Sequence, residues 1–218
     1  MPRFILREFR NRTMHWLLIK MVRDRPGILN EVTISLLKHG INIRNIIGNS
    51  HVLMINIEDN INGTVHDLSM VRDIEPLEIL NEPITPLAFS QKQLLTAFKT
   101  VLQQVGTKEV ERMLYRLGYE YAKAIVTEIP IGDPITAIKT YLYTATAYNR
   151  LVLKNLEVTR DEIRIEFVNP FDEELNIVFT EGYIHGLINT AYSKLYTITI
   201  NKHNNTYIAI AKPLQLQQ

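Results

Sequence analysis

Apolar positions in the first third of the chain alternate between strand-like and helix-like spacing. The run WLLIKMVRD at 16–24 is typical of a buried strand. Apolar residues at 28, 32, 36 and 37 then recur at helical spacing, which predicts a helix over 27–39. Pro26 suits its first turn, because the amide hydrogen that proline lacks has no intrahelical partner there, and Gly40 suits a left-handed stop.

Further runs complete a first domain. Two β-rich runs, 41–48 and 51–57, flank the turn signal Gly48-Asn49-Ser50, which predicts a hairpin. A helix is predicted over 64–73 and a strand over 74–80. The resulting order of strand, helix, strand, strand, helix and strand is the ferredoxin-like βαββαβ order. The stretch NEPITP at 81–86 carries two prolines in six residues and predicts a domain boundary.

The remainder of the chain predicts helices packed on an antiparallel sheet. Helices are expected over 94–105, 107–129 and 133–149, the last opened by Asp133 as cap and Pro134 in its first turn. Strands are expected at 151–158 and 162–168, a helix at 173–194, and a hairpin at 196–201 and 206–211. The sequence thus predicts an α+β protein with an N-terminal arm at 1–15, a first domain at 16–82, a linker at 83–93 and a second domain at 94–218.

Composition narrows the classes of function. The 218 residues are 46% hydrophobic and 22% charged, which is typical of globular proteins, and the net charge of +1 argues against nucleic acid or an anionic membrane as partner. Cysteine is absent, which excludes disulfides and cysteine-ligated metals and is typical of a cytoplasmic protein. The N-terminus lacks the apolar core of a signal peptide, and no apolar run approaches the ~20 residues that span a bilayer.

Two short motifs flank the first predicted helix: DRPGIL at 24–29 and GINI at 40–43. They match the D-x-P-G-x-L and G-I-N-I pattern of the ACT family of regulatory modules, which the first domain resembles. The resemblance implies that an amino acid or a related metabolite binds this turn at a subunit interface. Amide groups at a helix N-terminus favour a carboxylate, although a Pro-Gly turn also serves simply to join a strand to a helix. The implied site comprises Asp24, Arg25, Pro26, Gly27, Ile28, Leu29, Asn42 and Ile43.

Three stretches of the second domain, LGYE at 117–120, NPF at 169–171 and FTEGYIHGL at 179–187, resemble the 4-vinyl-reductase-like family. The resemblance implies an apolar cavity between helices and sheet. Many members carry cysteines, probable zinc ligands, that this chain lacks, so a zinc role does not carry over. No G-x-G-x-x-G follows a strand, so no nucleotide cofactor is expected. The possible pocket residues are Tyr119, Phe171, Phe179, Tyr183 and His185.

No catalytic set and no metal site can be assembled from sequence neighbours, because the six histidines are scattered and the acidic residues fall in turns and at helix starts. Tyrosines between 115 and 148 suit an aromatic cavity wall, but helix-on-sheet packing explains them equally well. The leading hypothesis is a non-enzymatic regulatory protein that senses a small molecule. The alternatives are an enzyme that uses the C-terminal cavity and a transcription regulator that has no recognisable helix-turn-helix.

Subunit pairing is the last expectation from the sequence. The runs at 16–19 and 51–57 are apolar on both sides, which a strand with one solvent-facing side is not. A second subunit, the arm at 1–13 or the C-terminal domain would cover such a surface. ACT-like modules commonly pair, so we expect a homo-oligomer formed through the first domain, with Val52→Lys or Met54→Lys weakening it.

Overall fold

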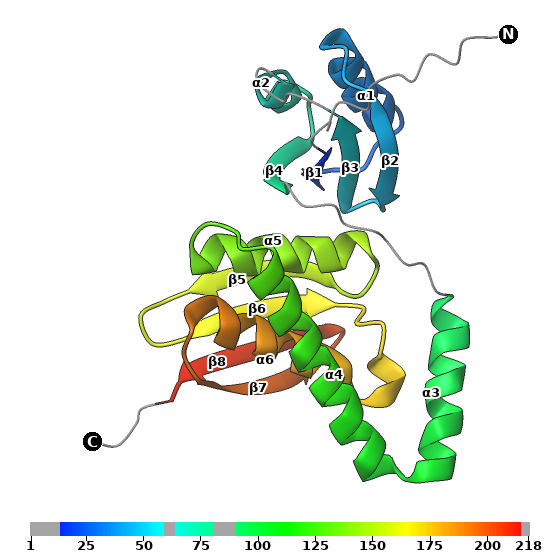
Figure 1. Cartoon of the computed structure of the whole chain (residues 1–218), viewed down its shortest axis with the longest axis vertical. Helices are drawn as coiled ribbons and strands as arrows, with labels where there is room; N and C mark the ends of the chain where they lie inside the picture. Colours follow the sequence, from blue (N-terminus) through cyan, green and yellow to red (C-terminus); the bar gives the residue numbers. More distant parts are fainter. Residues whose placement is uncertain (1–13, 59–63, 81–89, 215–218) are drawn as a thin grey trace, which may run out of the picture. The chain divides into compact units, whose positions relative to one another are not determined.

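The computed structural model describes residues 14–58, 64–80 and 90–214 (Figure 1). The chain divides into two compact units, Met1–Ile84 and Thr85–Gln218. Most of the predicted arm and the predicted boundary at 81–86 lie outside the described residues. Within the described ranges, no helix is both long enough and apolar enough to cross a membrane.

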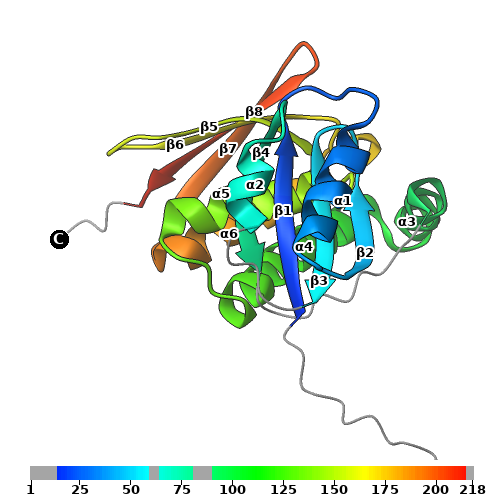
Figure 2. The same ribbon diagram turned by 90° about the horizontal axis from the view of Figure 1, so that it is seen from above.

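The first unit contains the predicted order of elements. They are β1 (Met14–Met21), α1 (Ile28–Lys38), β2 (Ile43–Gly48), β3 (Val52–Glu58), α2 (Thr64–Ser69) and β4 (Ile74–Leu80). The strands form an antiparallel sheet in the order β2-β3-β1-β4. Both helices lie on one face of it (Figure 2). Gly40, after α1, adopts the predicted left-handed conformation with φ +66°.

Both faces of the central strands of this sheet are buried. Leu17 and Ile19 of β1 pack with Val32 and Leu36 of α1 in the core beneath the helices. On the opposite face Trp16, Leu18, Val52 and Met54 are buried too. The weakening expected of Val52→Lys and Met54→Lys stays a prediction. The homo-oligomer remains a prediction.

The second unit places helices on an antiparallel sheet, so the predicted α+β class is confirmed. Its elements are α3 (Gln91–Val105), α4 (Thr107–Glu128), α5 (Pro134–Ala147), β5 (Val152–Val158), β6 (Ile163–Val168), η1 (Glu173–Leu175), α6 (Val178–Tyr192), β7 (Tyr196–His203) and β8 (Thr206–Pro213). The sheet order is β5-β6-β8-β7. Asp133 caps α5 as predicted, accepting hydrogen bonds from the amides of Ile135 and Thr136.

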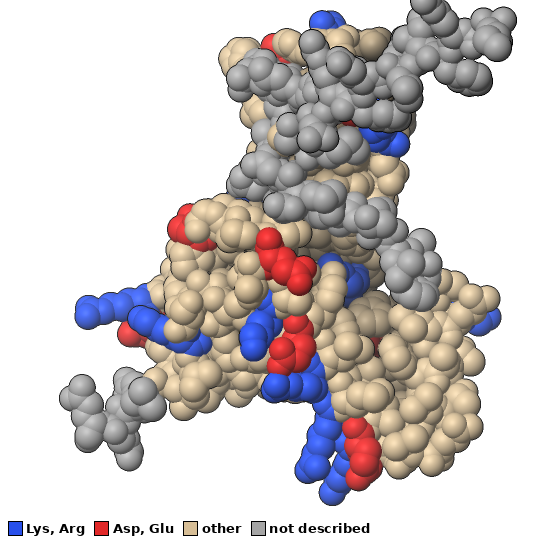
Figure 3. Space-filling model, viewed as in Figure 1, with Lys and Arg blue, Asp and Glu red and all other residues tan. Residues whose placement is uncertain are grey.

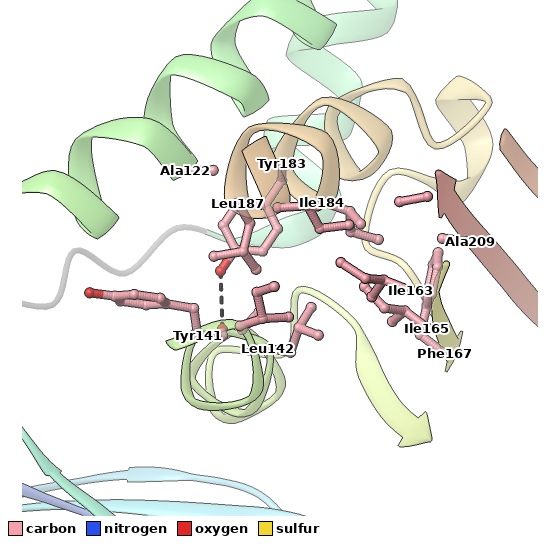
Figure 4. Packing of buried hydrophobic residues seen from close by; sticks show 14 of the residues in the cluster. Ala122, Tyr141, Leu142, Ile163, Ile165, Phe167, Tyr183, Ile184, Leu187 and Ala209 are labelled. Atoms are coloured by element: carbon pink, nitrogen blue, oxygen red, sulfur yellow. Dashed lines mark hydrogen bonds between the residues drawn. The ribbon is translucent and has the colours of Figure 1, made fainter. Parts of the chain in front are cut away.

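The core of the second unit lies between the sheet and α5 and α6. Alternate residues of β6, among them Ile165 and Phe167, point toward Ile184 and Leu187 of α6 and Leu142 of α5 (Figure 4). Helix α4 crosses α6 on its outer side (Figure 1). Across this core the hydroxyl of Tyr183 donates a 3.0 Å hydrogen bond to the backbone carbonyl of Tyr141.

The helix predicted over 173–194 is interrupted, which corrects the sequence analysis. A 3-10 turn covers Glu173–Leu175, the next two residues are left-handed (φ +57° and +54°), and α6 begins only at Val178. The buried carboxylate of Asp172 explains the break. It accepts hydrogen bonds from the amide and the hydroxyl of Thr180, so its side chain caps the first turn of α6 from outside the helix.

Candidate binding site around Arg150

Helices α4 and α6 approach one another at their glycines. A Cβ on Gly118 would lie 2.9 Å from the backbone nitrogen of Tyr183, and one on Gly186 would lie 2.9 Å from the Cα of Tyr119. Backbone therefore packs on backbone where the two helices cross. One turn beyond Gly118, the ring of Tyr121 lies 6.0 Å from the ring of Tyr183.

Arg150 is held beside these rings through its backbone. It follows α5 after the left-handed residue Asn149 (φ +56°). Its amide donates to the carbonyl of Ala145 at 2.9 Å, and its carbonyl accepts from the amide of Phe171 at 2.8 Å. Both hydrogen bonds are independent of the side chain, so the position of residue 150 is set by the fold.

The guanidinium group of Arg150 lies among three tyrosine rings. Its central carbon is 5.0 Å from the ring centroid of Tyr121, 5.1 Å from that of Tyr183 and 5.6 Å from that of Tyr148. These distances are in the range of cation–π attraction. The Nε and Nη2 atoms are buried, and neither has a hydrogen-bond partner in the described part of the chain. The hydroxyl of Tyr148 is likewise buried without a partner.

The aromatic surroundings of Arg150 extend from the interior to the surface. Tyr183 is 2% exposed and Tyr121 is 40% exposed. Phe171 and Phe179, which are in edge contact at 5.3 Å, continue the same group, because Phe179 lies 6.5 Å from Tyr121. We call these five rings and Arg150 the Arg150 cluster: Tyr121, Tyr148, Phe171, Phe179, Tyr183 and Arg150.

Two phenols of the Arg150 cluster, those of Tyr148 and Tyr183, stay protonated at neutral pH. Burial raises the pKa of Tyr148, and the neighbouring Arg150 opposes that rise only in part. Burial also raises the pKa of Tyr183. Burial removes water from the charged form of each phenol, which is the physical cause in both cases. The cluster thus presents one cation and neutral hydroxyl groups.

The structure brings together three of the five predicted pocket residues. Phe171, Phe179 and Tyr183 belong to the Arg150 cluster. His185 instead joins helices α4 and α6 to strand β7, and Tyr119 joins α4 to α6. The Tyr115 hydroxyl hydrogen-bonds to Nδ1 of His185, whose Nε2 lies 2.8 Å from the carbonyl oxygen of Tyr196. The carbonyl can only accept, so Nε2 carries the proton and Nδ1 accepts from the tyrosine.

Tyr119 also has a structural role, since its hydroxyl accepts a 3.2 Å hydrogen bond from the side-chain amide of Asn189. Arg150 itself is the residue that sequence reasoning missed. The available signal was a lone arginine next to Leu151, directly after a helix that reads as mostly apolar or neutral. Nothing in the sequence shows that this arginine is without a carboxylate partner.

Two polar side chains of the predicted first-unit site, Arg25 and Asn42, have partners within the chain. Arg25 donates to both carboxylate oxygens of Glu31, at 2.7 and 2.8 Å, and to Asp73 at 2.9 Å. Asn42 donates to the buried Glu58 at 3.0 Å. Gly27 has φ +93°, which side chains disfavour, so a glycine there is required by the backbone. Ligand binding at Asp24–Leu29 and Asn42–Ile43 stays a prediction, and Gly27→Val is a poor control because it strains the backbone.

A shallow cavity of about 430 Å³ lies elsewhere on the first unit, between α1 and α2. None of the residues that line this cavity belongs to the predicted turn site. Glu31 contacts that site through its ion pair with Arg25. The lining residues are Glu31, Ile34, Ser35, Lys38, Asp67, Met70, Val71 and Arg72.

No family model and no curated protein matches the chain. Similar solved structures include the phenol-responsive sensory domain of the transcription activator PoxR with phenol, at 11% identity over 62% of this chain and 80% of that chain, with a TM-score of 0.47. An H-NOX protein from S. oneidensis is 10% identical over 62% and 80%, with a TM-score of 0.45. An oxygen-binding H-NOX domain related to soluble guanylate cyclases is 16% identical over 63% and 82%, with a TM-score of 0.42.

All three TM-scores are below 0.5, so these likenesses support no inference about ligand or activity. The neighbours nevertheless differ from both families assigned from the sequence, and the ACT and 4-vinyl-reductase-like assignments are wrong. Amino-acid binding was implied by the ACT resemblance and falls with it. The motifs misled because the fold itself demands them: Gly27 supplies a left-handed turn, and Gly182 and Gly186 allow two helices to touch.

Proposed function

We propose that this chain is a small-molecule-sensing regulatory protein without catalytic activity, and that its ligand binds the Arg150 cluster. The observation that carries the proposal is a guanidinium group whose buried Nε and Nη2 have no hydrogen-bond partner among the described residues, beside rings that reach the surface. A buried unpaired donor costs about 1–3 kcal/mol. A ligand acceptor would recover that free energy.

The chemistry of the cluster favours binding over catalysis. The phenols of Tyr148 and Tyr183 have pKa values raised by burial and do not act as bases at neutral pH. No histidine or carboxylate belongs to the cluster. Among the described residues, no group of three or more histidine, aspartate or glutamate side chains is placed to hold a metal ion. The absorbance spectrum and intact mass of the purified protein test the rival enzyme hypothesis, which a bound chromophore would favour.

DNA binding is not part of the proposal. Arg116 pairs with Glu120 one turn later on α4, and Lys123 also lies near Glu120. Figure 3 shows basic and acidic side chains together along this helix. A DNA-reading helix presents a basic face instead.

The proposal is tested by thermal-shift screening and calorimetry with small aromatic compounds, both neutral and acidic. At least one compound should raise the midpoint of unfolding, because a ligand that binds only the folded state stabilises it. Tyr121→Ala should weaken binding of that compound. Leu117→Ala, an exposed position one turn earlier on α4, should leave it unchanged. No binding by any compound, or equal binding by both variants, would contradict the proposal.

A further inference from the structure

The two unpaired nitrogens of Arg150 belong to one edge of its guanidinium group. The N–H bonds of Nε and Nη2 lie in the guanidinium plane and point in parallel along one edge of the group. Two parallel N–H bonds match the two oxygens of a carboxylate. Both atoms are buried. The unsatisfied part of Arg150 is therefore a two-pronged donor rather than a diffuse positive charge.

Arg25 shows what the same side chain does when the chain supplies its partners. Its two terminal nitrogens bind both oxygens of Glu31, and its Nε binds Asp73. All three nitrogens of Arg25 are thus paired with carboxylates. No carboxylate of the described chain forms an ion pair with Arg150, whose neighbours are rings. Arg150 has the same capacity, and its buried Nε and Nη2 have no hydrogen-bond partner among the described residues.

We propose that the ligand of the Arg150 cluster is an aromatic carboxylic acid, bound as its anion through the Nε and Nη2 edge of Arg150. This inference rests on the proposed function. The buried hydroxyl of Tyr148, on a ring 5.6 Å from the guanidinium carbon, is placed to donate a third hydrogen bond to the carboxylate. The body of the ligand packs against Tyr121, which is exposed at the outer end of the cluster.

Two alternatives fit the cluster less well. A phosphate carries more charge and more oxygens than one arginine and one phenol balance, and such sites usually gather several cations or backbone amides. A single ordered water accepts at most two hydrogen bonds and offers no countercharge to a buried guanidinium. A planar acid satisfies both donors, neutralises the charge and covers apolar ring surface at once.

The experiment compares matched ligands by calorimetry: benzoate, phenylacetate, and their neutral isosteres benzamide and phenylacetamide. Either acid should bind at least about tenfold more tightly than its neutral isostere, since hydrogen bonds to charged groups are the stronger ones. Arg150→Gln should abolish this preference. Arg150→Lys should weaken acid binding by about tenfold, because lysine lacks the parallel pair. Tyr148→Phe should weaken it by a similar factor, and Arg160→Gln, an exposed turn position, should not change it.

The outcomes separate the two proposals. Equal affinity for acids and isosteres, unaffected by Arg150→Gln, would overturn the carboxylate inference and leave a neutral ligand of the cluster in place. Binding of inorganic phosphate as tight as that of benzoate would also overturn the carboxylate inference. Failure of every aromatic compound to bind would overturn the proposed function itself. Circular dichroism of each variant establishes that it is folded before affinities are compared.

Discussion

Gly182 on α6 lies directly against the backbone of Tyr115 on α4, where an added Cβ would come within 2.8 Å of the carbonyl carbon and closer still to its oxygen. The same helices meet again at Gly118 and Gly186. This contact sets how α4 passes over α6. It therefore determines where Tyr121 and Tyr183 stand relative to Arg150.

Gly182→Ala should lower the free energy of unfolding by about 1–3 kcal/mol, because the methyl group overlaps backbone that cannot move aside. The sign is informative, since alanine ordinarily favours a helix over glycine by about 1 kcal/mol. Urea denaturation at neutral pH measures the change. Ala124→Gly, at an exposed site on α4, serves as control for helix propensity alone. A more stable Gly182→Ala protein would show that the helices are not in backbone contact.

His185→Leu should lower the free energy of unfolding by about 1–3 kcal/mol, because it leaves the Tyr115 hydroxyl and the Tyr196 carbonyl without their partner. Ligand affinity at the Arg150 cluster should stay unchanged, since His185 bridges α4, α6 and β7 outside it. His203→Leu, exposed at the end of β7, should change stability by no more than about 0.5 kcal/mol. Loss of ligand affinity in a stable His185→Leu protein would return this histidine to the binding site.

Periodicity predicted most of the fold because helices such as α1 bury one face at helical spacing, while β1 and β3, buried on both faces, read as continuous apolar runs. It failed at 173–177, where helical spacing continues but a tertiary contact decides otherwise. The buried carboxylate of Asp172 captures Thr180 and delays the helix to Val178. Nothing local in the sequence distinguishes an aspartate that caps from one that is solvated.

The candidate site was only partly predictable for a related reason. Phe171, Phe179 and Tyr183 share a motif-rich stretch and were found. Tyr121 and Arg150 come from two other elements, and their significance depends on spatial neighbours. An arginine with paired donors, such as Arg25, and one with unpaired donors, such as Arg150, look alike in a sequence.

Acid should weaken the attachment of η1 to β7 and β8. The pKa of Glu173 is lowered chiefly by its hydrogen bond from Lys202 and then by that from Tyr207. A carboxylate whose pKa is lower in the folded state stabilises that state above its ordinary pKa of 4.5, and the contribution is lost as pH falls through the folded value. Glu173→Gln should therefore be less stable than the unaltered protein at neutral pH, and the difference should shrink as the pH falls below 4.5 and through the lowered pKa of Glu173.

Urea denaturation of both proteins from neutral to acid pH measures this difference. Asp161→Asn, in the exposed turn between β5 and β6, is the control for removing one negative charge. The difference in stability between the two proteins could instead widen as the pH falls. Such a pH dependence would be opposite to the expected one and would exclude the ion pair with Lys202.

Arg150→Met should leave the ligand-free protein as stable as before or more stable by about 1 kcal/mol. Methionine keeps much of the contact with the three tyrosine rings and removes buried donors that have no hydrogen-bond partner among the described residues. The backbone hydrogen bonds of residue 150 to Ala145 and Phe171 do not depend on the side chain and remain. Arginine at this position would then be kept for binding at some expense of stability.

Arg25→Met is the matched comparison and should lower the free energy of unfolding, because it leaves Glu31 and Asp73 without their shared partner. Thermal and urea denaturation without ligand, repeated with benzoate, completes the test. Benzoate should raise the unfolding midpoint of the unaltered protein and not that of Arg150→Met. If Arg150→Met were instead destabilised as much as Arg25→Met, Arg150 would be a structural residue whose partners lie within the chain.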